Sequence, residues 1–421
     1  MNPPRPGDAW IRPHARLGVA LVVVAVALVV SFARRPGDFA GYILVGDLVL
    51  HGQDIYAAAP PGLSTWPPFF ALVCVPLALL ARWSLVGARV AWLLLNAAAL
   101  VAVLALVTHL VARGPGDARP SARVPALSSA AALVPLLLSA RYVSSNFEHL
   151  QVNVLIFLLS LIGLALIGAR REALGGLALG AAAALKVMPA LFVLLLVWRR
   201  RWRAAGWTVL AAVGLSLSPG VVFGWDRLVT YARSWLAVLR VGWSVGKMNQ
   251  SVYAMWDRSL GHGIVPFTVR GFNDLAPSHD LAVGIASALS LAAVAALVLW
   301  SFRPRGARDP RAELIEWSVV FLVASLFGTV AWKAYLVVLL LPNALLIDAW
   351  RSSDLDAATR KGALIFALAA FALGVLTTDE IIGSAAAGRL EMGSIVTLSA
   401  LVVLAGLLWL RRRIGAAESV R

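Results

Sequence analysis

Residues 173–198 read ALGGLALGAAAALKVMPALFVLLLVW, an apolar run that is interrupted by Lys186 and Pro189. A helix needs about 20 apolar residues to cross a bilayer, so the run is long enough to cross once. A lysine in the middle of such a run is costly unless it is paired or faces water, and a proline removes a helical hydrogen bond. The stretch therefore fits either one interrupted span or two half-helices of about 12 residues, roughly 18 Å each, that meet near Lys186.

The rest of the chain is also apolar: of its 421 residues, 60% are hydrophobic and 14% are charged, and the mean hydropathy is +0.83. Soluble proteins carry roughly 25% charged residues. The composition therefore predicts an all-α polytopic membrane protein. The net charge of +16 comes largely from arginines in short clusters between apolar runs. This pattern is typical of cytoplasmic loops that face anionic lipid, so nucleic acid is not expected as a partner.

The cysteine and histidine pattern predicts no metal centre. Cys74 is the single cysteine and lies inside an apolar run, so neither an internal disulfide nor a thiolate metal site is expected. The histidines are isolated from one another, and neither HExxH nor CxxC occurs. We therefore expect no bound metal and no cofactor.

Further apolar runs predict membrane spans at 15–33, 88–112, 124–140, 151–169, 206–223, 282–302, 313–331, 335–350, 362–378 and 393–410. Segment 67–82 (PPFFALVCVPLALLAR) is short and contains Pro76. Together these runs predict one membrane domain over 1–421, a bundle of about 10–13 transmembrane helices with re-entrant or broken segments. No small-residue cleavage site follows the first run, so it is not expected to be a removed signal peptide.

Two topologies differ in where they place the arginines. If 67–82 and 173–198 both cross the membrane, five arginines fall outside and two fall inside; if both return to the side they came from, the two groups exchange sides. The five are Arg113, Arg119, Arg123, Arg170 and Arg171, and the two are Arg82 and Arg89. Because cytoplasmic loops carry an excess of arginine, the second topology is favoured. It makes 67–82 a re-entrant or interfacial piece and 173–198 a pair of half-helices.

Both topologies predict the same extracytoplasmic segments of an inner or plasma membrane protein, namely 34–66, 224–281, 332–334 and 379–392. The N-terminus and the C-terminal tail are expected in the cytoplasm. Segment 224–281 is mildly apolar and rich in Trp, Arg and Tyr. It therefore predicts interfacial helices with an aromatic belt.

The first outer segment holds three acids. Asp38 precedes a helix-compatible run, where aspartate is a favoured N-cap, a role that is compatible with catalysis. Asp47 and His51 are four residues apart, which predicts a local hydrogen bond on one helix face. Asp54 lies in turn-like sequence before Tyr56, so a turn role and substrate contact are both compatible with it.

More polar residues open or interrupt apolar runs. His149 is a candidate donor to a phosphate or sugar, and Gln151 and Asn153 are candidates to bind hydroxyls; a polar helix end among headgroups explains them equally well. Lys186 is central in its run, whereas a snorkelling lysine lies near a span end. At the tip of a broken helix pair, Lys186 would face water and neutralise a phosphate. A snorkelling or buried, paired lysine is the alternative.

Two further groups are predicted on the outer side. Asn249-Gln250-Ser251 forms a polar patch with Tyr253 and Arg258 among aromatic residues. Trp332-Lys333-Ala334-Tyr335 predicts a very short turn between two spans. Such a turn would hold Lys333 at the level of lipid phosphates, where it serves either a bound phosphate or ordinary anchoring.

Short patterns follow one another in a fixed order along the chain. D-F-x-x-Y, G-x-D-x-Y and P-P-F occur at Asp38-Phe39 with Tyr42, at Gly52, Asp54 and Tyr56, and at Pro67-Pro68-Phe69. G-Q-V-N occurs without its glycine at Leu150-Gln151-Val152-Asn153, A-L-K-x-x-P at Ala184–Pro189, and N-Q-S at Asn249-Gln250-Ser251. The pattern S-P-x-S-W-x-H-Y aligns with residues 328–335, where only its tryptophan and tyrosine are present, as Trp332 and Tyr335. Ala334 stands at the position of its histidine. In this order the patterns resemble glycosyltransferase family 87, within the GT-C superfamily of membrane transferases.

The resemblance covers roughly residues 35–340. It implies an inverting transferase with a GT-C-like bundle that moves a sugar, commonly mannose, from a polyprenyl-phosphate donor on the extracytoplasmic face. The expected partners are this donor, a glycolipid or polysaccharide acceptor, and membrane lipids. Carried over, the family's catalytic acid falls on Asp38. The substrate-binding candidates are Tyr42, Asp54, Tyr56, His149, Gln151, Asn153, Lys186, Asn249, Gln250, Arg258, Trp332, Lys333 and Tyr335.

In the expected reaction, Asp38 takes the proton of an acceptor hydroxyl as general base. Cations then stabilise the charge that develops on the leaving lipid monophosphate, and Lys333 is a candidate to replace the missing histidine. A lipid-linked-oligosaccharide flippase or transporter is one alternative, although such proteins often show internal repeats and paired ionisable residues buried across several spans. An O-antigen-type polymerase, which uses diphosphate-linked glycans, is another.

Overall fold

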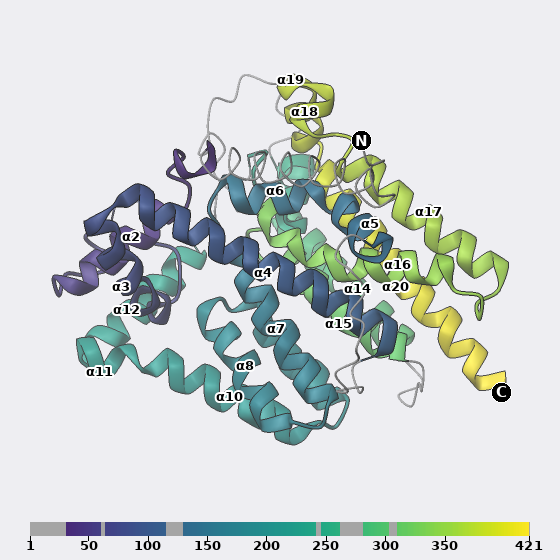
Figure 1. Ribbon diagram of the computed structural model, residues 1–421, viewed down its shortest axis with the longest axis horizontal. Coiled ribbons are helices and arrows are strands. Elements are labelled where there is room, and N and C mark those ends of the chain that lie inside the picture. Colours follow the sequence, from purple (N-terminus) through teal and green to yellow (C-terminus); the bar gives the residue numbers. More distant parts are fainter. Residues whose placement is uncertain are drawn as a thin grey trace, which may run out of the picture.

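The computed structural model describes residues 31–59, 64–114, 129–240, 246–261, 281–302 and 310–420, and the regular elements within these ranges are all helices (Figure 1). The protein is an all-α polytopic membrane protein, as the sequence predicts. Six stretches of the described chain are long and apolar enough to cross a membrane. Residues 15–30 of the first predicted span, Arg119, Arg123, and residues 241–245 and 262–280 of the long outer segment lie outside the described residues.

The helices have the following bounds. The first part of the chain forms α2 (Phe39–Leu50), α3 (Pro68–Trp83), α4 (Leu85–Arg113), α5 (Ala130–Leu138), α6 (Ala140–Glu148) and α7 (Asn153–Gly168). The middle forms α8 (Glu172–Leu185), η1 (Met188–Leu191), α9 (Phe192–Trp198), α10 (Trp202–Leu217), α11 (Pro219–Phe223), α12 (Trp225–Arg240), α13 (Val252–Trp256), η2 (Asp257–Gly261) and α14 (Leu281–Ser301). The last part forms α15 (Pro310–Leu326), η3 (Lys333–Leu339), α16 (Leu340–Arg351), α17 (Ala357–Gly374), α18 (Asp379–Ile382), α19 (Ser384–Met392) and α20 (Ile395–Val420).

The stretch 173–198 is broken at Lys186, whose backbone is extended (φ −157°, ψ 122°) between α8 and η1. Its second half returns to the end from which α8 starts, because Arg201 donates to the carbonyl of Ile167 at 3.3 Å and to Glu172 at 3.4 Å. The predicted pair of half-helices is therefore confirmed. Glycines allow the close packing around it: a Cβ at Gly175 or Gly180 would lie within 2.5 Å of a backbone oxygen of α7 or α10.

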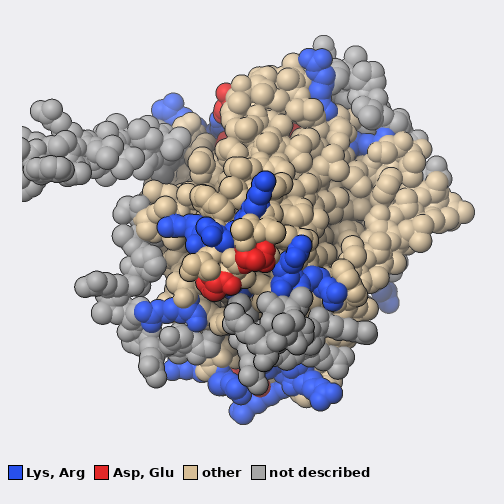
Figure 2. All heavy atoms as spheres, turned by 90° about the vertical axis from the view of Figure 1, so that its right-hand side faces the viewer, with Lys and Arg blue, Asp and Glu red and all other residues tan. Residues whose placement is uncertain are grey.

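Helix ends and turns that carry arginines lie together at one end of the molecule. Gly114 packs against Pro310, and Glu316 is paired with both Arg199 and Arg411. Figure 2 shows Lys and Arg side chains, around a smaller group of Asp and Glu, on the side of the molecule where Figure 1 places the C-terminus. The C-terminal end of α4 and the connection between α7 and α8 thus lie at the same end as Arg199. This excludes the topology in which 67–82 and 173–198 both cross, whereas the cytoplasmic orientation of this end stays a prediction.

The predicted outer segments meet at the opposite end, where two of them also contact residues of the 141–149 stretch. The backbone N–H of Asp38 donates to the carbonyl of His149 at 2.8 Å, and Arg227 of α12 donates to the carbonyl of Gly52 at 3.0 Å. The carboxylate of Glu391 in α19 accepts from Arg141 at 2.5 Å and from Lys333 at 2.7 Å. Segments that are far apart in the sequence are therefore tied together around one region.

The predicted short turn at Trp332–Tyr335 is wrong. Helix α15 ends at Leu326, residues 327–332 are not helical, and 333–339 form the 3₁₀ helix η3. The reason lies in residues that are distant in sequence. The side chain of Asn249 donates to the carbonyl of Thr329 at 2.9 Å and accepts from the backbone N–H of Ala331 at 3.0 Å. These bonds satisfy backbone groups that a helix would otherwise have to satisfy itself.

Cysteine labelling tests this arrangement of ends. Arg171 and Arg200 are exposed beside the two arginine-rich turns, and Gln53 is exposed at the opposite end. In a Cys74→Ala background, we expect Arg171→Cys and Arg200→Cys to react with a membrane-impermeant maleimide from the same side of sealed vesicles. Gln53→Cys should react from the other side, and the background alone should not react. Labelling of positions 171 and 200 from opposite sides would exclude the returning half-helices.

Candidate functional site

A chain of polar side chains links Asp38 to Lys186 at the end opposite the arginine clusters. The Nε2 of Gln151 donates to Oδ2 of Asp38 at 2.5 Å. The Oε1 of Gln151 accepts from Nδ2 of Asn153 at 3.1 Å, and Oδ1 of Asn153 accepts from Nζ of Lys186 at 2.6 Å. The structure thus brings together four of the predicted site residues, from three separate parts of the chain.

Asp38 is fixed by the backbone around it. It stands at the N-cap position of α2, but its side chain makes no capping hydrogen bond, so the carboxylate is directed to Gln151 instead. Gly37 before it has φ +49°, and a Cβ there would lie 2.4 Å from the carbonyl oxygen of His149. Only glycine fits this close approach, which lets the N–H of Asp38 donate to that carbonyl at 2.8 Å.

The amide side chains are held by a tight turn between α6 and α7. Leu150 has a positive φ of 49°, and its carbonyl accepts from the indole N–H of Trp92 at 2.9 Å. The backbone N–H of Gln151 donates to the carbonyl of Asn146 at 2.8 Å. Gln151 and Asn153 are both buried, so these contacts leave them little freedom to turn away.

Asn146 extends the chain of amide side chains and is not among the residues that the sequence predicts for the site. Its Oδ1 accepts from Asn153 at 3.2 Å, and its Nδ2 donates to the carbonyl of Ala334 at 2.9 Å. It therefore connects the amide chain to the residue before Tyr335. The available signal was its position in the same polar stretch as Gln151 and Asn153.

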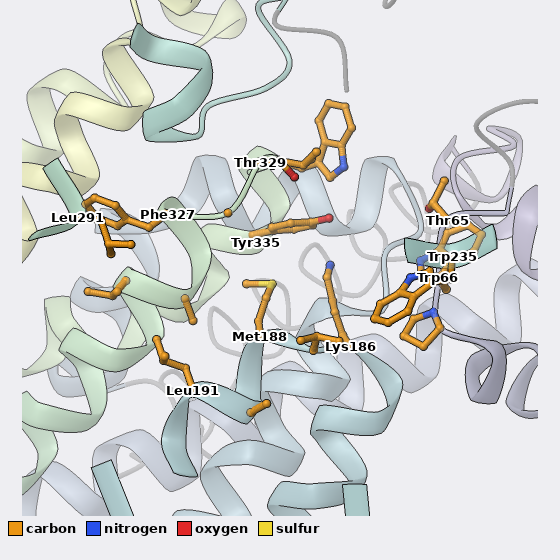
Figure 3. A pocket seen from close by; sticks show the side chains of 18 of the residues that line it. Thr65, Trp66, Lys186, Met188, Leu191, Trp235, Leu291, Phe327, Thr329 and Tyr335 are labelled. Atoms are coloured by element: carbon orange, nitrogen blue, oxygen red, sulfur yellow. The ribbon is translucent and has the colours of Figure 1, made fainter. Parts of the chain in front are cut away.

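Lys186 lies at a large apolar cavity. Its ammonium nitrogen is 3.4 Å from the ring centroid of Tyr335, and the cavity has a volume of about 720 Å³. Figure 3 shows the Lys186 side chain reaching into this cavity below Tyr335, with Trp66 and Trp235 on one side and Leu291 on the other. One cation in an otherwise mostly apolar cavity matches a ligand with one anionic group and a long apolar portion.

The protonation of Asp38 is set by opposing effects. Burial raises the pKa of its carboxyl, while the charges of Lys186 and His149 and the hydrogen bond from Gln151 lower it. Burial dominates, so the pKa lies above its usual value. Such a carboxylate accepts a proton more readily than an exposed aspartate does.

A model of glycosyltransferase family 87 matches residues 65–328, more than half of the chain. The chain belongs to glycosyltransferase family 87. It is also 28% identical over 321 residues to a protein of Mycobacterium tuberculosis named polyprenol-phosphate-mannose-dependent alpha-(1-2)-phosphatidylinositol pentamannoside mannosyltransferase. That alignment covers 75% of this chain but 63% of the relative, which is less than two thirds of the relative's length.

The family match covers Gln151, Asn153 and Lys186, whereas Asp38 and Tyr335 lie outside it. The hydrogen bond from Gln151 to Asp38 connects Asp38 directly to a residue that the family match covers. Within the described ranges of this family 87 protein, no group of three or more His, Cys, Asp or Glu side chains is placed to hold a metal ion.

Three predicted residues of the first outer segment make contacts within the protein. Tyr42 is fully buried among aromatic rings that include Trp66, 4.9 Å away between centroids. The carboxylate of Asp54 accepts the backbone N–H groups of Tyr56 and Ala57, each at 2.8 Å, which is a turn contact. The hydroxyl of Tyr56 donates to the carbonyl of Trp66 at 2.7 Å. Substrate contact by these residues stays a prediction.

Asp47 contacts His51, as predicted, and also contacts Arg82. The Nδ1 of His51 lies 2.9 Å from the carbonyl oxygen of Asp47 and 3.3 Å from its carboxylate. Arg82 of α3 also donates to that carboxylate at 2.8 Å. Asp47 therefore helps to join α2 to α3, away from the amide chain.

The N-Q-S motif is buried and bonded to other parts of the protein. Gln250 is 0% exposed, and its side-chain amide donates to the carbonyls of Lys247 at 2.7 Å and of Glu391 at 2.8 Å. Arg258 is 1% exposed and donates to the carbonyl of Asn249 at 2.7 Å and to Ser394 at 2.5 Å. Asn249 bonds to Thr329 and Ala331, and the backbone N–H of Gln250 donates to the carbonyl of Ala331 at 2.7 Å, so the motif positions residues 329–331. Direct substrate binding by Asn249, Gln250 and Arg258 stays a prediction.

The remaining predicted cations and donors differ in their access to the cavity. Trp332 lines it beside Tyr335, whereas the ammonium of Lys333 is engaged by Glu391 at 2.7 Å. The Nδ1 of His149 lies 3.0 Å from the carbonyl oxygen of Ser145. Of these cations, Lys186 alone among the described residues lines the 720 Å³ cavity.

Proposed function

We propose that this protein transfers a sugar, mannose, from a polyprenyl-phosphate donor to a hydroxyl group of a glycolipid or polysaccharide on the extracytoplasmic face of the membrane. The proposal rests on one observation above all. The carboxylate of Asp38 and the ammonium of Lys186 are joined through Gln151 and Asn153, and Lys186 lies at an apolar cavity. A base and a phosphate-binding cation are thus held at a fixed separation.

In this reaction, Asp38 removes the proton from the acceptor hydroxyl as its oxygen attacks the anomeric carbon of the donor sugar. The bond between that carbon and the phosphate oxygen breaks as the new glycosidic bond forms on the opposite face, so the configuration inverts. The proton remains on Asp38, and the bond electrons leave with the lipid phosphate.

The leaving phosphate keeps the charge that develops in this step, and Lys186 is positioned to stabilise it. The ammonium is held by Asn153 and by the ring of Tyr335, so little reorganisation is needed when charge appears. The polyprenyl chain would lie in the cavity against apolar side chains such as Leu191 and Phe327. Lys333 is less suited to this role because Glu391 already neutralises it.

The sugar and the donor are supported by the printed name of the Mycobacterium tuberculosis relative, which is polyprenol-phosphate-mannose-dependent. The side of the membrane is supported by charge, because the arginines at 199–201 lie at the end of α7 and α8 opposite Asp38 and Lys186. By the positive-inside tendency, the site then faces away from the cytoplasm.

Replacing Asp38 tests the base. We expect membranes that contain the wild type to transfer label from polyprenyl-phosphate-mannose to an endogenous acceptor, and Asp38→Asn to reduce the rate by about 100-fold or more. Asp47→Asn is the matched control, since Asp47 lies in the same helix but pairs with Arg82. Near-normal transfer by Asp38→Asn would remove Asp38 from the mechanism. Failure of the wild type with every lipid-monophosphate sugar would refute the proposed function itself.

The pH dependence of transfer tests the bond between Gln151 and Asp38. Transfer requires the ionised carboxylate, so the rate falls as the pH drops through the pKa of Asp38. The hydrogen bond from Gln151 lowers that pKa. Gln151→Ala should therefore shift the acid limb of the rate profile upward by about one pH unit, whereas Gln53→Ala at an exposed site should leave it in place. An unchanged acid limb in Gln151→Ala would contradict the assignment.

A further inference from the structure

A second cavity, of about 240 Å³, lies at the arginine-rich end of the molecule. It is enclosed by α7, α9, α15 and the turn that follows α9. Its polar walls are Arg199, Arg201, Glu313 and Glu316, and its apolar walls include Leu164 and Leu195. Because α8 separates Glu172 from Lys186 by 14 residues of helix, this cavity is roughly 20 Å from the proposed transfer site.

The two acids of this cavity differ in their partners. Glu316 is paired with Arg199 and also accepts from Nε of Arg411 at 3.0 Å, so its charge is neutralised within the protein. Glu313 has no hydrogen bond or ion pair to any residue that the structure describes, although the charges of Arg201, Arg199 and Arg170 act on it. A partly buried carboxylate without a donor is costly, and it lies against an open volume.

Arg201 has hydrogen-bonding capacity left toward the same cavity. Its contacts to the carbonyl of Ile167 and to Glu172, at 3.3 and 3.4 Å, are longer than usual for N–H···O bonds. The cavity therefore offers a carboxylate and a guanidinium that both lack strong partners. A purely anionic ligand would face Glu313, and a purely cationic ligand would face the arginines. A ligand that carries an ammonium and a phosphate close together satisfies both.

We infer that this cavity binds the headgroup of an aminophospholipid, with its ammonium on Glu313 and its phosphate on Arg201. The arginine-rich end of a membrane protein lies at the depth of lipid headgroups, and the apolar walls at Leu164 and Leu195 would receive the start of the acyl chains. Bound there, the lipid would bridge α7, α9 and α15 at the base of the broken pair. The inference is independent of the sugar-transfer proposal.

Lipid-dependent stability tests this site, since a ligand that binds the folded state raises its melting temperature. We would titrate the purified full-length protein in detergent with phosphatidylethanolamine, phosphatidylcholine and phosphatidylglycerol, and follow thermal unfolding. Phosphatidylethanolamine should bind about tenfold more tightly than the other two. The trimethylammonium of phosphatidylcholine has no N–H to donate to Glu313, and phosphatidylglycerol lacks the cation.

The preference should depend on Glu313. Glu313→Gln should bind phosphatidylethanolamine and phosphatidylcholine equally, while Glu380→Gln, an exposed site at the other end of the molecule, should retain the preference. If Glu313→Gln does not fold, Arg201→Gln provides a second test, because it should weaken phosphatidylethanolamine and phosphatidylcholine binding alike. Lack of a preference in the wild type, or its persistence in Glu313→Gln, would overturn the inference.

Water-soluble glycerophosphoethanolamine separates a lipid from a soluble ligand with the same headgroup. We expect it to bind at least about tenfold more weakly than phosphatidylethanolamine, because it lacks the acyl chains that would contact Leu164 and Leu195. Equal binding of the two would overturn the assignment to a lipid.

Discussion

The structure depends on the cost of placing the charged Lys186 in the middle of an apolar run. A charge in hydrocarbon must be hydrated or paired, and here it is met by Asn153 at 2.6 Å and by the ring of Tyr335 at 3.4 Å. Reaching these partners requires an extended backbone at residue 186, which ends α8 and starts the return through η1 and α9. The same residue therefore breaks the helix and faces the cavity.

The contacts of Lys186 also connect the broken helix to Asp38. Asn153 receives Lys186 on one atom and donates from another to Gln151, which in turn holds Asp38. The half-helices return to the arginine-rich end, where Arg199, just after α9, pairs with Glu316 of α15. A proposed base and a proposed phosphate site are thereby supported by packed helices rather than by free loops. Precise placement of this kind is what group transfer requires.

Local sequence predicts those features that follow from hydropathy and charge. The all-α membrane class follows from the composition and apolar runs of the whole chain. The break at Lys186 and the return of 173–198 follow from residues within that stretch and from the positions of arginines in the chain. Partners that are distant in sequence were not predictable in this way. Asn146 joining Asn153 to Ala334, and Asn249 holding 329–331 out of helical form, carry no local periodic signal. For the same reason, local sequence makes Lys333 a candidate for a bound phosphate or for anchoring and does not reveal its partner Glu391, 58 residues later.

The central claim is that Lys186, and not Lys333, receives the donor phosphate. The most direct measurement is the affinity of the purified protein for a polyprenyl monophosphate without sugar, determined for Lys186→Met and Lys333→Met beside the wild type. Removal of the cavity's lysine should weaken binding by about tenfold or more. Lys333→Met should bind nearly as well as the wild type, because Arg141 remains to pair with Glu391. Unchanged binding in Lys186→Met together with a large loss in Lys333→Met would contradict this claim.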